Sequence, residues 1–309
     1  MKTEEYILNW LLEGDQSIRW QALQGFTNSP QSKILSERKK VASVGWGAKL
    51  LSYQNANGMW ADSLYSRKWI STTYTMMLLK NLGLMPGHKQ AIKACKVLLD
   101  EGLYEDGGIN YFYQYNHSET CVTGIVLSIL AYFLFDDPRI KSLGTHLLKQ
   151  QRQDGGWNCL SYKGATHSSF HTTINVLEGL KEYRVNYELN TKAISNSIKR
   201  GIEFLLTHKL FRSHRAGNIV DSKMTRFSFP TGWRYDILRA LDFFQDVNAP
   251  KDERMKEAIE LVLKRRENNG KWKLQNLHAG RYFFEMEEVG KPSRWNTIRA
   301  LRVLKWWEQ

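Results

Sequence analysis

Apolar residues recur at intervals of three and four along most of the chain, which is the spacing of one face of an α-helix. Two kinds of helical segment alternate. The first kind mixes its apolar positions with basic residues, as in HKQAIKACKVLLDEG and DERMKEAIELVLKRRE, and the second kind is more apolar, as in ETCVTGIVLSILAYF and RWNTIRALRVLKWW. The sequence shows no alternating pattern of a β-strand. The pattern therefore predicts an all-α protein in which basic outer helices alternate with apolar inner helices.

A turn that contains glycine separates each outer helix from the inner helix after it. Turn glycines at positions 58, 107, 155, 217 and 270 are spaced about 50 residues apart, and three turns share the pattern Gln or Arg, three residues, Gly, one residue, Trp (54–60, 151–157 and 266–272). Periods of this length are typical of stacked or circular arrays. We predict an α/α toroid of about six helical hairpins, as a single domain over residues 1–309, with inner helices near 15–26, 70–83, 119–135, 169–184, 232–245 and 293–307.

Composition narrows the class of protein further. The 309 residues include 44 Lys plus Arg against 31 Asp plus Glu, 11 Trp and 3 Cys. The apolar runs fall short of the roughly 18 residues that cross a bilayer, and the first residues do not resemble a signal peptide. Three widely spaced cysteines argue against a disulfide framework. We expect a cytoplasmic protein. Its basic surface is also compatible with peripheral contact to an anionic membrane.

The three Gln/Arg-x3-Gly-x-Trp turns resemble the QW repeats of squalene cyclases. Through them the chain resembles the α/α-toroid superfamily of terpenoid cyclases and protein prenyltransferase β subunits over nearly its whole length. The resemblance implies that Gln and Trp tie the end of an outer helix to the loop before the next inner helix. It also implies an isoprenoid or similar apolar substrate in the central cavity.

Aligning the inner helices places candidate ligands in one register. Cys121 and His171 occupy equivalent positions at the starts of adjacent inner helices, and Cys159 lies in the loop that leads to His171. Two thiolates and an imidazole with one open position suit zinc. We predict a zinc site at Cys121, Cys159 and His171. The alternative is that the two cysteines are small buried side chains and that His171 is a hydrogen-bonded core histidine. Cys95 lies on an outer helix, where we expect a buried side chain that binds no metal.

Family knowledge supports this site in part. Prenyltransferases hold zinc through Asp-x-Cys and His at helix starts, which Glu119-Thr120-Cys121 and Phe170-His171-Thr172 resemble, although Glu replaces Asp and the basic diphosphate-binding stretch is missing. Lanthionine-cyclase-like toroids use Cys, Cys and His. Both resemblances imply a metal-activated thiol. The Asp-x-Asp-Asp acid motif of squalene-type cyclases is not present in the sequence.

Polar and aromatic residues near the inner-helix starts complete the predicted site. Asp236, His167 and Glu119 are the candidate catalytic residues, with Asp236 the only carboxylate in the two aligned helix-start columns. The insertion at 208–232 is interpreted as a lid, an anion-binding loop or a solvated insertion. The candidate substrate-binding residues are Trp20, Thr72, Tyr235, Trp295 and Arg234.

The leading hypothesis is a zinc-dependent prenyltransferase-like or terpenoid cyclase-like enzyme, a transferase or lyase, that acts on an isoprenoid-like substrate. The alternatives are a non-catalytic toroid that binds a lipid or peptide and a thiol-addition enzyme. Most basic residues, including Arg38, are assigned to the solvated face of outer helices. No nucleic-acid reader motif is found, so nucleic acid is not the expected partner.

Overall fold

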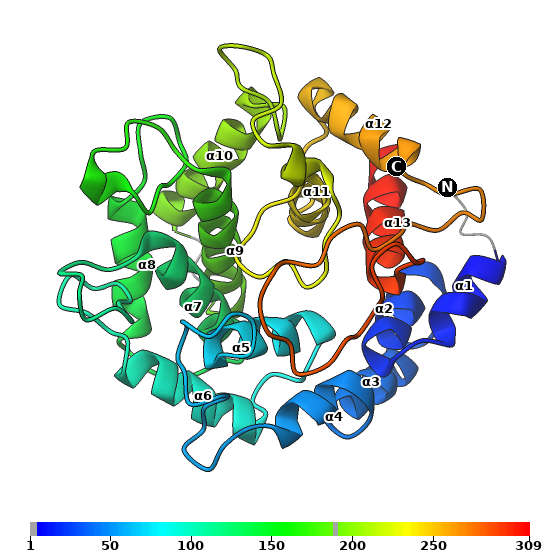
Figure 1. The fold of residues 1–309 in the computed structure, drawn as a ribbon, viewed down its shortest axis with the longest axis horizontal. Helices are drawn as coiled ribbons and strands as arrows, with labels where there is room; N and C mark the ends of the chain where they lie inside the picture. The colour runs from blue at the N-terminus through cyan, green and yellow to red at the C-terminus, as the bar shows by residue number, and fades with distance from the viewer. Residues whose placement is uncertain (1–4, 188–190) are drawn as a thin grey trace.

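The helices form two concentric rings. The computed structural model describes residues 5–187 and 191–309, and these contain thirteen α-helices. Figure 1 shows one set of helices around a central axis and a second set outside it. The inner helices are α2 (Gln16–Phe26), α5 (Thr72–Leu82), α7 (Thr120–Tyr132), α9 (Phe170–Asn186), α11 (Ile237–Asp246) and α13 (Arg294–Glu308). The outer helices are α1 (Glu5–Leu12), α3 (Gln31–Lys39), α4 (Gly45–Ser52), α6 (Lys89–Asp100), α8 (Ile140–Lys149), α10 (Lys192–Thr207) and α12 (Lys256–Lys264).

The predicted all-α toroid is confirmed. Within the described ranges, β-pairing is limited to isolated bridges. One outer position holds two helices instead of one, because α3 continues into the 3₁₀ turn η1 (Lys40–Ala42) and the chain then bends at Gly45, whose φ is +75°. A side chain at Gly45 would meet the carboxylate of Asp15, which accepts a hydrogen bond from Trp46 N at 2.8 Å. The single-domain assignment stays a prediction.

In all three Gly-x-Trp turns the tryptophan bonds to the preceding outer helix, and in two of them a glutamine also reaches the next outer helix. The indole N–H of Trp60, Trp157 and Trp272 donates to the backbone carbonyl ten residues earlier, near the end of the preceding outer helix, at 2.7–2.8 Å. The amide of Gln54 donates to Gln90 O at 2.9 Å, and thereby reaches the next outer helix. Gln151 makes the equivalent bond to Ser197 O at 2.8 Å. These side chains therefore serve packing.

Contacts between the first and last helices close the ring. Arg302 in α13 donates to Gln21 Oε1 in α2 at 2.8 Å. Arg294 Nε donates to Trp10 O at 2.9 Å. Both bonds join segments more than 280 residues apart in the sequence. The toroid is thus closed by side chains of its terminal helices.

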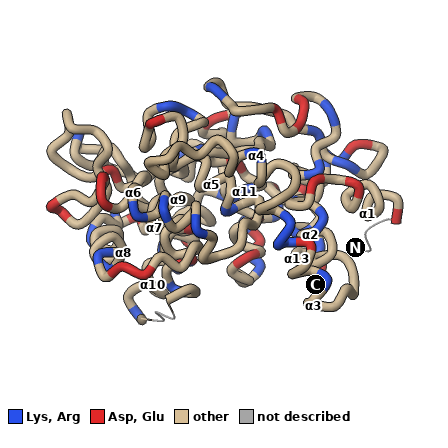
Figure 2. Tube along the Cα trace, turned by 90° about the horizontal axis from the view of Figure 1, so that it is seen from below, with Lys and Arg blue, Asp and Glu red and all other residues tan. Residues whose placement is uncertain are grey.

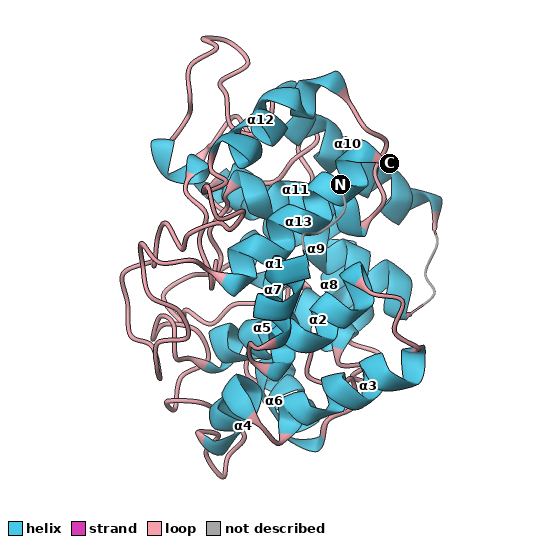
Figure 3. Ribbon diagram, turned by 90° about the vertical axis from the view of Figure 1, so that its right-hand side faces the viewer, coloured by secondary structure: helices cyan, strands magenta, loops and turns pink. Residues whose placement is uncertain are grey.

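The two ends of the ring differ in the length of their connections (Figure 3). At the loop end, where the inner helices begin, lie the long segments 61–71, 104–119, 158–169, 211–236 and 274–293. At the turn end, where the inner helices finish, the connections are short, such as 83–88 and 247–252. Basic and acidic residues are interspersed over the chain (Figure 2). None of the described helices is long and apolar enough to span a membrane.

Candidate functional site

A cavity of about 370 Å³ lies inside the inner ring. All six inner helices contribute to its wall, mostly through their middle and last turns. Five aromatic, six cationic and four acidic residues line it: Trp20, Tyr132, Phe229, Phe243, Trp295; Arg38, Lys80, Lys181, Arg239, Arg299, Arg302; Glu178, Glu182, Asp242, Asp246. The volume falls in the range of small-molecule pockets. The cavity therefore lies further along the inner helices than the sequence analysis placed it.

Loops cover the end of the cavity where the inner helices begin. In Figure 1 the segment 274–293 crosses the front of the ring. It is held to the segment 61–71 by two backbone hydrogen bonds of 2.8 Å, from Trp69 N to Arg281 O and from Arg281 N to Lys68 O. Trp69 also packs closely against Gly232 and Gly280, where no side chain would fit. Packed loops thus cover the inner-helix starts, where the sequence analysis placed the site.

The cavity wall near the loop end is aromatic. Trp295, in the first turn of α13, is 2% exposed and stacks on Phe229 with ring centroids 4.1 Å apart. Phe229 and Thr231 belong to the insertion, and both line the cavity. The insertion has a second part, in which Arg212 and Ile219 pair as an isolated antiparallel bridge in a projecting hairpin. One part of the insertion is therefore a roof over the cavity.

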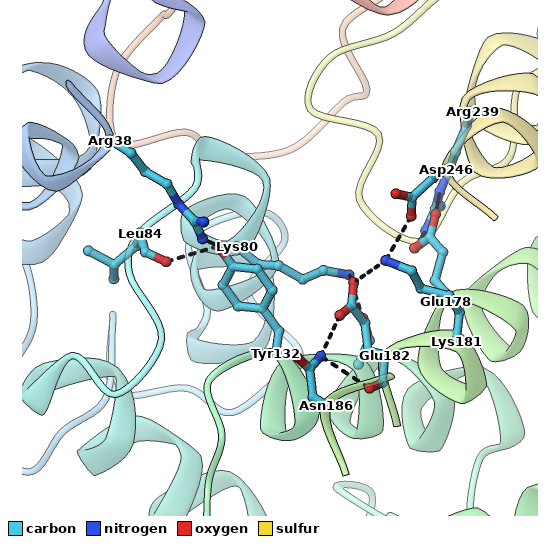
Figure 4. Close-up of polar contacts among 11 residues, drawn as sticks. Arg38, Lys80, Leu84, Tyr132, Glu178, Lys181, Glu182, Asn186, Arg239 and Asp246 are labelled. Carbon is cyan, nitrogen blue, oxygen red and sulfur yellow. Dashed lines mark hydrogen bonds and ion pairs between the residues drawn. The ribbon is translucent and has the colours of Figure 1, made fainter. Parts of the chain in front are cut away.

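A network of Lys and Glu side chains lies nearer the turn end (Figure 4). Glu182 pairs with Lys80 at 3.4 Å and with Lys181 at 3.3 Å, and Lys181 also pairs with Asp246 at 2.8 Å. Burial would raise the pKa of Glu182, but the charges of the two lysines outweigh it and hold the pKa below its ordinary value. Glu182 is therefore ionised at neutral pH and cannot act there as a proton donor.

Arg38 reaches the same region from the outer helix α3 (Figure 4). Its guanidinium donates to Gly83 O at 2.9 Å and to the hydroxyl of Tyr132 at 2.8 Å. It also lies over the ring of Trp20, 5.0 Å from the centroid. The sequence analysis assigned Arg38 to a solvated outer face, and this is wrong because the long side chain extends inward past the end of α5.

Three arginines on α11 and α13 add positive charge to the wall. Arg239 forms a two-pronged pair with Glu178 at 2.8 and 2.7 Å. Burial alone would raise the pKa of Glu178, but Arg239 holds it below its ordinary value. Arg299 and Arg302 share the one carboxylate of Asp242 at 3.3 and 3.1 Å. The cations of the wall thus outnumber its carboxylates.

Two donors in this wall lack acceptors. The indole N–H of Trp295 and Nε of Arg302 are buried and have no hydrogen-bond partner among the described residues. Both residues line the cavity. A buried donor without an acceptor is costly, and a bound oxygen-rich group would satisfy it. The arrangement can therefore accept the anionic or polar part of a ligand.

The structure brings the two predicted cysteine ligands together. Cys159 Sγ accepts a hydrogen bond from the backbone N of Cys121 at 3.1 Å, in the first turn of α7, and one from the hydroxyl of Thr172 at 3.5 Å. The bond with the Cys121 thiol lowers the pKa of Cys159 and raises that of Cys121. Cys95 is buried on α6, as predicted. The two thiols thus form a pair at the loop end.

His171 does not fit a zinc site in this arrangement. Its Nδ1 accepts a hydrogen bond from Tyr235 N at 2.9 Å, so the neutral ring carries its proton on Nε2 and has no free lone pair for a metal. Burial and the charges of Arg234 and Arg239 lower the pKa of His171 to about 4. Across the described ranges, no group of three or more His, Cys, Asp and Glu side chains could hold a metal ion. Zinc binding stays a prediction.

The three candidate catalytic residues lie apart from the cavity. Asp236 caps α11, where it accepts from Arg239 N at 2.8 Å and from Ser228 N at 3.2 Å, and burial raises its pKa. Glu119 is the residue before α7, and burial raises its pKa as well. His167 is exposed in the loop before α9. None of the three lines the cavity.

The candidate substrate-binding residues divide into two groups. Trp20 and Trp295 line the cavity. Thr72, Tyr235 and Arg234 do not, and each serves a local contact instead. The hydroxyl of Thr72 donates to Ser63 O at 2.9 Å, that of Tyr235 donates to Leu210 O at 2.5 Å, and the guanidinium of Arg234 lies over the ring of Trp233 at 4.7 Å.

Sequence reasoning missed the cations of the cavity wall. Its alignment considered the first turn of each inner helix, whereas Lys80, Lys181 and Arg302 lie in later turns. A signal was present, because these charges occur within the most apolar class of helix. A charged side chain in a buried helix needs a partner or a ligand. These positions lie in the middle and late turns of the inner helices, beyond the aligned first turns.

Comparisons with known proteins give only a distant likeness. No protein-family model and no curated protein matches the chain. Among solved structures, the type II terpene cyclase MstE from Scytonema is similar in three states: a complex with its product merosterolic acid A (14% identity, 88% of this chain and 96% of that chain, TM-score 0.38), the apo enzyme (13%, 87% and 97%, 0.35) and a complex with geranylgeranyl dihydroxybenzoate (14%, 87% and 96%, 0.36). Such low values do not place this chain in the family of that enzyme.

Proposed function

We propose that the central cavity binds a small isoprenoid-like molecule that carries an anionic group. The observation that carries this proposal is the excess of positive charge in the wall, with six cationic and four acidic residues. Low-dielectric walls strengthen the attraction of such an excess for an anion. The aromatic part of the wall, with Trp295 and Phe229, supplies contact area for an apolar chain or ring.

The cavity wall offers the ligand two kinds of contact. The aromatic side chains Trp295 and Phe229 lie near the loop end, whereas Lys80 and Lys181 lie in the late turns of α5 and α9. The ligand's apolar part would therefore contact Trp295 and Phe229, and its anionic group would contact the cations of the wall. The same lysines also offset the negative ends of the inner-helix dipoles. Binding measurements separate this structural role from ligand recognition.

Three probes test the proposal by isothermal titration calorimetry. Geranyl diphosphate carries both parts of the proposed ligand, geraniol only the apolar part and inorganic diphosphate only the anion. We expect geranyl diphosphate to bind most tightly, and Lys181→Gln to weaken it about tenfold through loss of one charge-assisted contact. Lys199→Gln, on the exposed face of α10, removes the same charge outside the cavity and is the control. Equal affinity for geranyl diphosphate in both variants and the wild type contradicts the proposal.

Acid-initiated cyclisation of that ligand is a second candidate function. Its support is that Asp236 is 2% exposed, has a pKa raised by burial and is linked to the cavity residue Arg299 through Ser228, whose N–H donates to Asp236 and whose carbonyl accepts from Arg299. Asp236→Asn keeps an oxygen to cap α11 but removes the acid. Loss of product formation by mass spectrometry, with an unchanged melting temperature, supports cyclisation. If Asp236→Asn still forms a cyclised product, Asp236 is not the acid.

Zinc-dependent thiol chemistry is the remaining part of the initial hypothesis. Its support is the Cys121–Cys159 pair, and the hydrogen bond at His171 Nδ1 opposes it. Metal analysis of protein purified without chelator shows whether zinc is bound at these residues. Stoichiometric zinc that falls on Cys121→Ala and on His171→Ala supports the three-ligand site. Protein without zinc, or zinc that is insensitive to these substitutions, excludes it.

A further inference from the structure

A second pocket lies at the loop end, outside the central cavity. It has a volume of about 280 Å³ and lies between the end of the insertion, the end of α12 and the segment 273–290. Arg226, Arg265 and Lys273 line it together with Gln275 and apolar Leu274 and Val289. Among the described residues that line it, none is Asp or Glu. Three cations therefore converge on one small hollow.

Backbone hydrogen bonds hold the walls of this pocket in place. Phe227 N donates to Gln275 Oε1 at 3.0 Å, and Gln275 N donates to Phe227 O at 3.1 Å. Leu274 N donates to Lys291 O at 2.9 Å, and Gly290 N donates back to Leu274 O at 2.8 Å. These bonds connect three segments that are distant in sequence. The cations are thus carried by a fixed scaffold and not by one flexible loop.

Two of the three cations have no carboxylate partner. Lys273 pairs with Glu267 at 2.8 Å. Arg226 and Arg265 form no ion pair with an acid in the described part of the chain, and burial together with the charge of Arg226 lowers the pKa of Arg265. The fold therefore keeps two guanidinium groups close enough to repel each other. Such a repulsion is relieved when an anion binds between them.

The position of Arg265 also leaves donors available. Its guanidinium lies over the ring of Phe227, 5.7 Å from the centroid, and makes one long hydrogen bond of 3.4 Å to the Thr225 hydroxyl. Its Nε is buried and has no hydrogen-bond partner among the described residues. The contact with the Phe227 ring and the bond to Thr225 hold the guanidinium in place, so its N–H groups are positioned before a ligand arrives. An oxygen acceptor is the group that this site lacks.

We propose that this pocket binds the phosphoryl group of a phosphate ester. Two guanidinium groups and an ammonium match a group with two negative charges and several oxygens better than a carboxylate, which has one charge and two oxygens. Val289, which is 49% exposed, would contact the organic part of the ester. The inference does not depend on the ligand of the central cavity.

Calorimetry with inorganic phosphate and phenyl phosphate tests the pocket directly. We expect saturable binding of both, and a loss of affinity of about tenfold for Arg226→Gln and for Arg265→Gln. The matched control is Lys223→Gln, which removes an exposed charge three residues from Arg226 but outside the pocket. Thermal melting checks that each variant is folded; if Arg265→Gln is not, the exposed Arg226 decides. Unchanged affinity in Arg226→Gln, or an equal loss in Lys223→Gln, overturns the proposal.

Vesicles separate the two sources of such a phosphoryl group. Sedimentation with vesicles of phosphatidylcholine alone is compared with sedimentation with vesicles that also contain phosphatidate. Recruitment by phosphatidate that Arg226→Gln weakens identifies a lipid headgroup. Binding of phenyl phosphate without recruitment to either vesicle identifies a soluble ester. If phosphate, phenyl phosphate and phosphatidate all fail to bind, the proposal is wrong.

Discussion

The loop end and the turn end of the ring use opposite kinds of interaction. At the loop end, Trp69 packs against glycines, and Trp295 stacks on Phe229. Toward the turn end, Lys80, Lys181 and Glu182 form a network of ion pairs around the cavity. Apolar packing contributes strongly to folding, whereas ion pairs contribute less and depend on their surroundings. Within the central cavity, the difference teaches that packing at the loop end holds the ring closed, whereas the ion-pair network can recognise a charged ligand.

The largest expected effect comes from removing a buried tryptophan of the loop-end turns. Trp157 is fully buried, and its indole N–H donates to Leu147 O at 2.8 Å. Trp157→Ala leaves a cavity and an unpaired carbonyl, so we expect a loss of about 3–5 kcal/mol in the free energy of unfolding, measured by urea denaturation. Trp307→Ala, at a partly exposed position, is the control. A loss no larger than that of the control would mean that these turns do not hold the ring.

Breaking a buried ion pair of the cavity wall is expected to cost less. Glu178→Ala leaves the guanidinium of Arg239, whose side chain is 6% exposed, without its carboxylate. We expect a loss of about 2–3 kcal/mol at pH 7. Because the pKa of Glu178 lies below its ordinary value near 4.5, its contribution is present above that pH and is lost as the pH falls below it. Denaturation curves from pH 7 to pH 3 should therefore converge for wild type and variant.

The lysines nearer the turn end provide the sharpest contrast between stability and binding. Lys181 is 17% exposed and has two acidic partners, so Lys181→Gln is expected to lower the free energy of unfolding by about 1 kcal/mol or less. The same substitution is expected to weaken geranyl diphosphate about tenfold. Parallel denaturation and calorimetry measure the two effects. A large loss of stability with unchanged binding would make the turn end structural and reverse the comparison.

The fold was predictable from the sequence because it depends on a repeated pattern. The Gly-x-Trp turns recur about every 50 residues, and each copy specifies the same local hydrogen bonds, such as that of Trp60 to Leu50 O. A prediction from periodicity rests on many residues at once. The one irregular outer position, which holds both α3 and α4, therefore did not affect the prediction of a ring. The order of inner and outer helices follows from their different polarity.

The site was predictable only in part, because it depends on where single side chains point. The helix register did bring Cys121 to Cys159, and it identified Trp20 and Trp295 as residues of one wall. It could not show that a backbone N–H occupies His171 Nδ1, since that donor comes from Tyr235, 64 residues later. Nor could it show that Arg38 crosses from the outer ring to the cavity. Contacts of this kind follow from tertiary packing and leave no periodic trace.

The smallest expected effect is a loss of folding stability at mildly acidic pH, which comes from a histidine at the loop end. His278 lies at the loop end, where burial and the charge of Arg234 lower its pKa to about 4, against an ordinary value of 6.5. The unfolded chain binds a proton between these values and the folded chain does not, so stability is full above pH 6.5 and falls as the pH drops toward 4. Allowing for the partial exposure of His278, we expect a loss of about 1 kcal/mol between pH 7 and pH 5.

His278→Asn tests the origin of this loss, because its side-chain amide can still bond to Asn276 but does not titrate in this range. The pH dependence of the urea midpoint between pH 7 and pH 5 should become shallower in this variant. His214→Asn, at an exposed position in the insertion, should leave it unchanged. The part of the loss that His278→Asn removes would then come from the loop end, whereas Glu178 and Glu182 of the cavity wall add theirs only below about pH 4.5. Equal slopes in wild type and His278→Asn would remove this distinction, since the loss above pH 5 would then have another source.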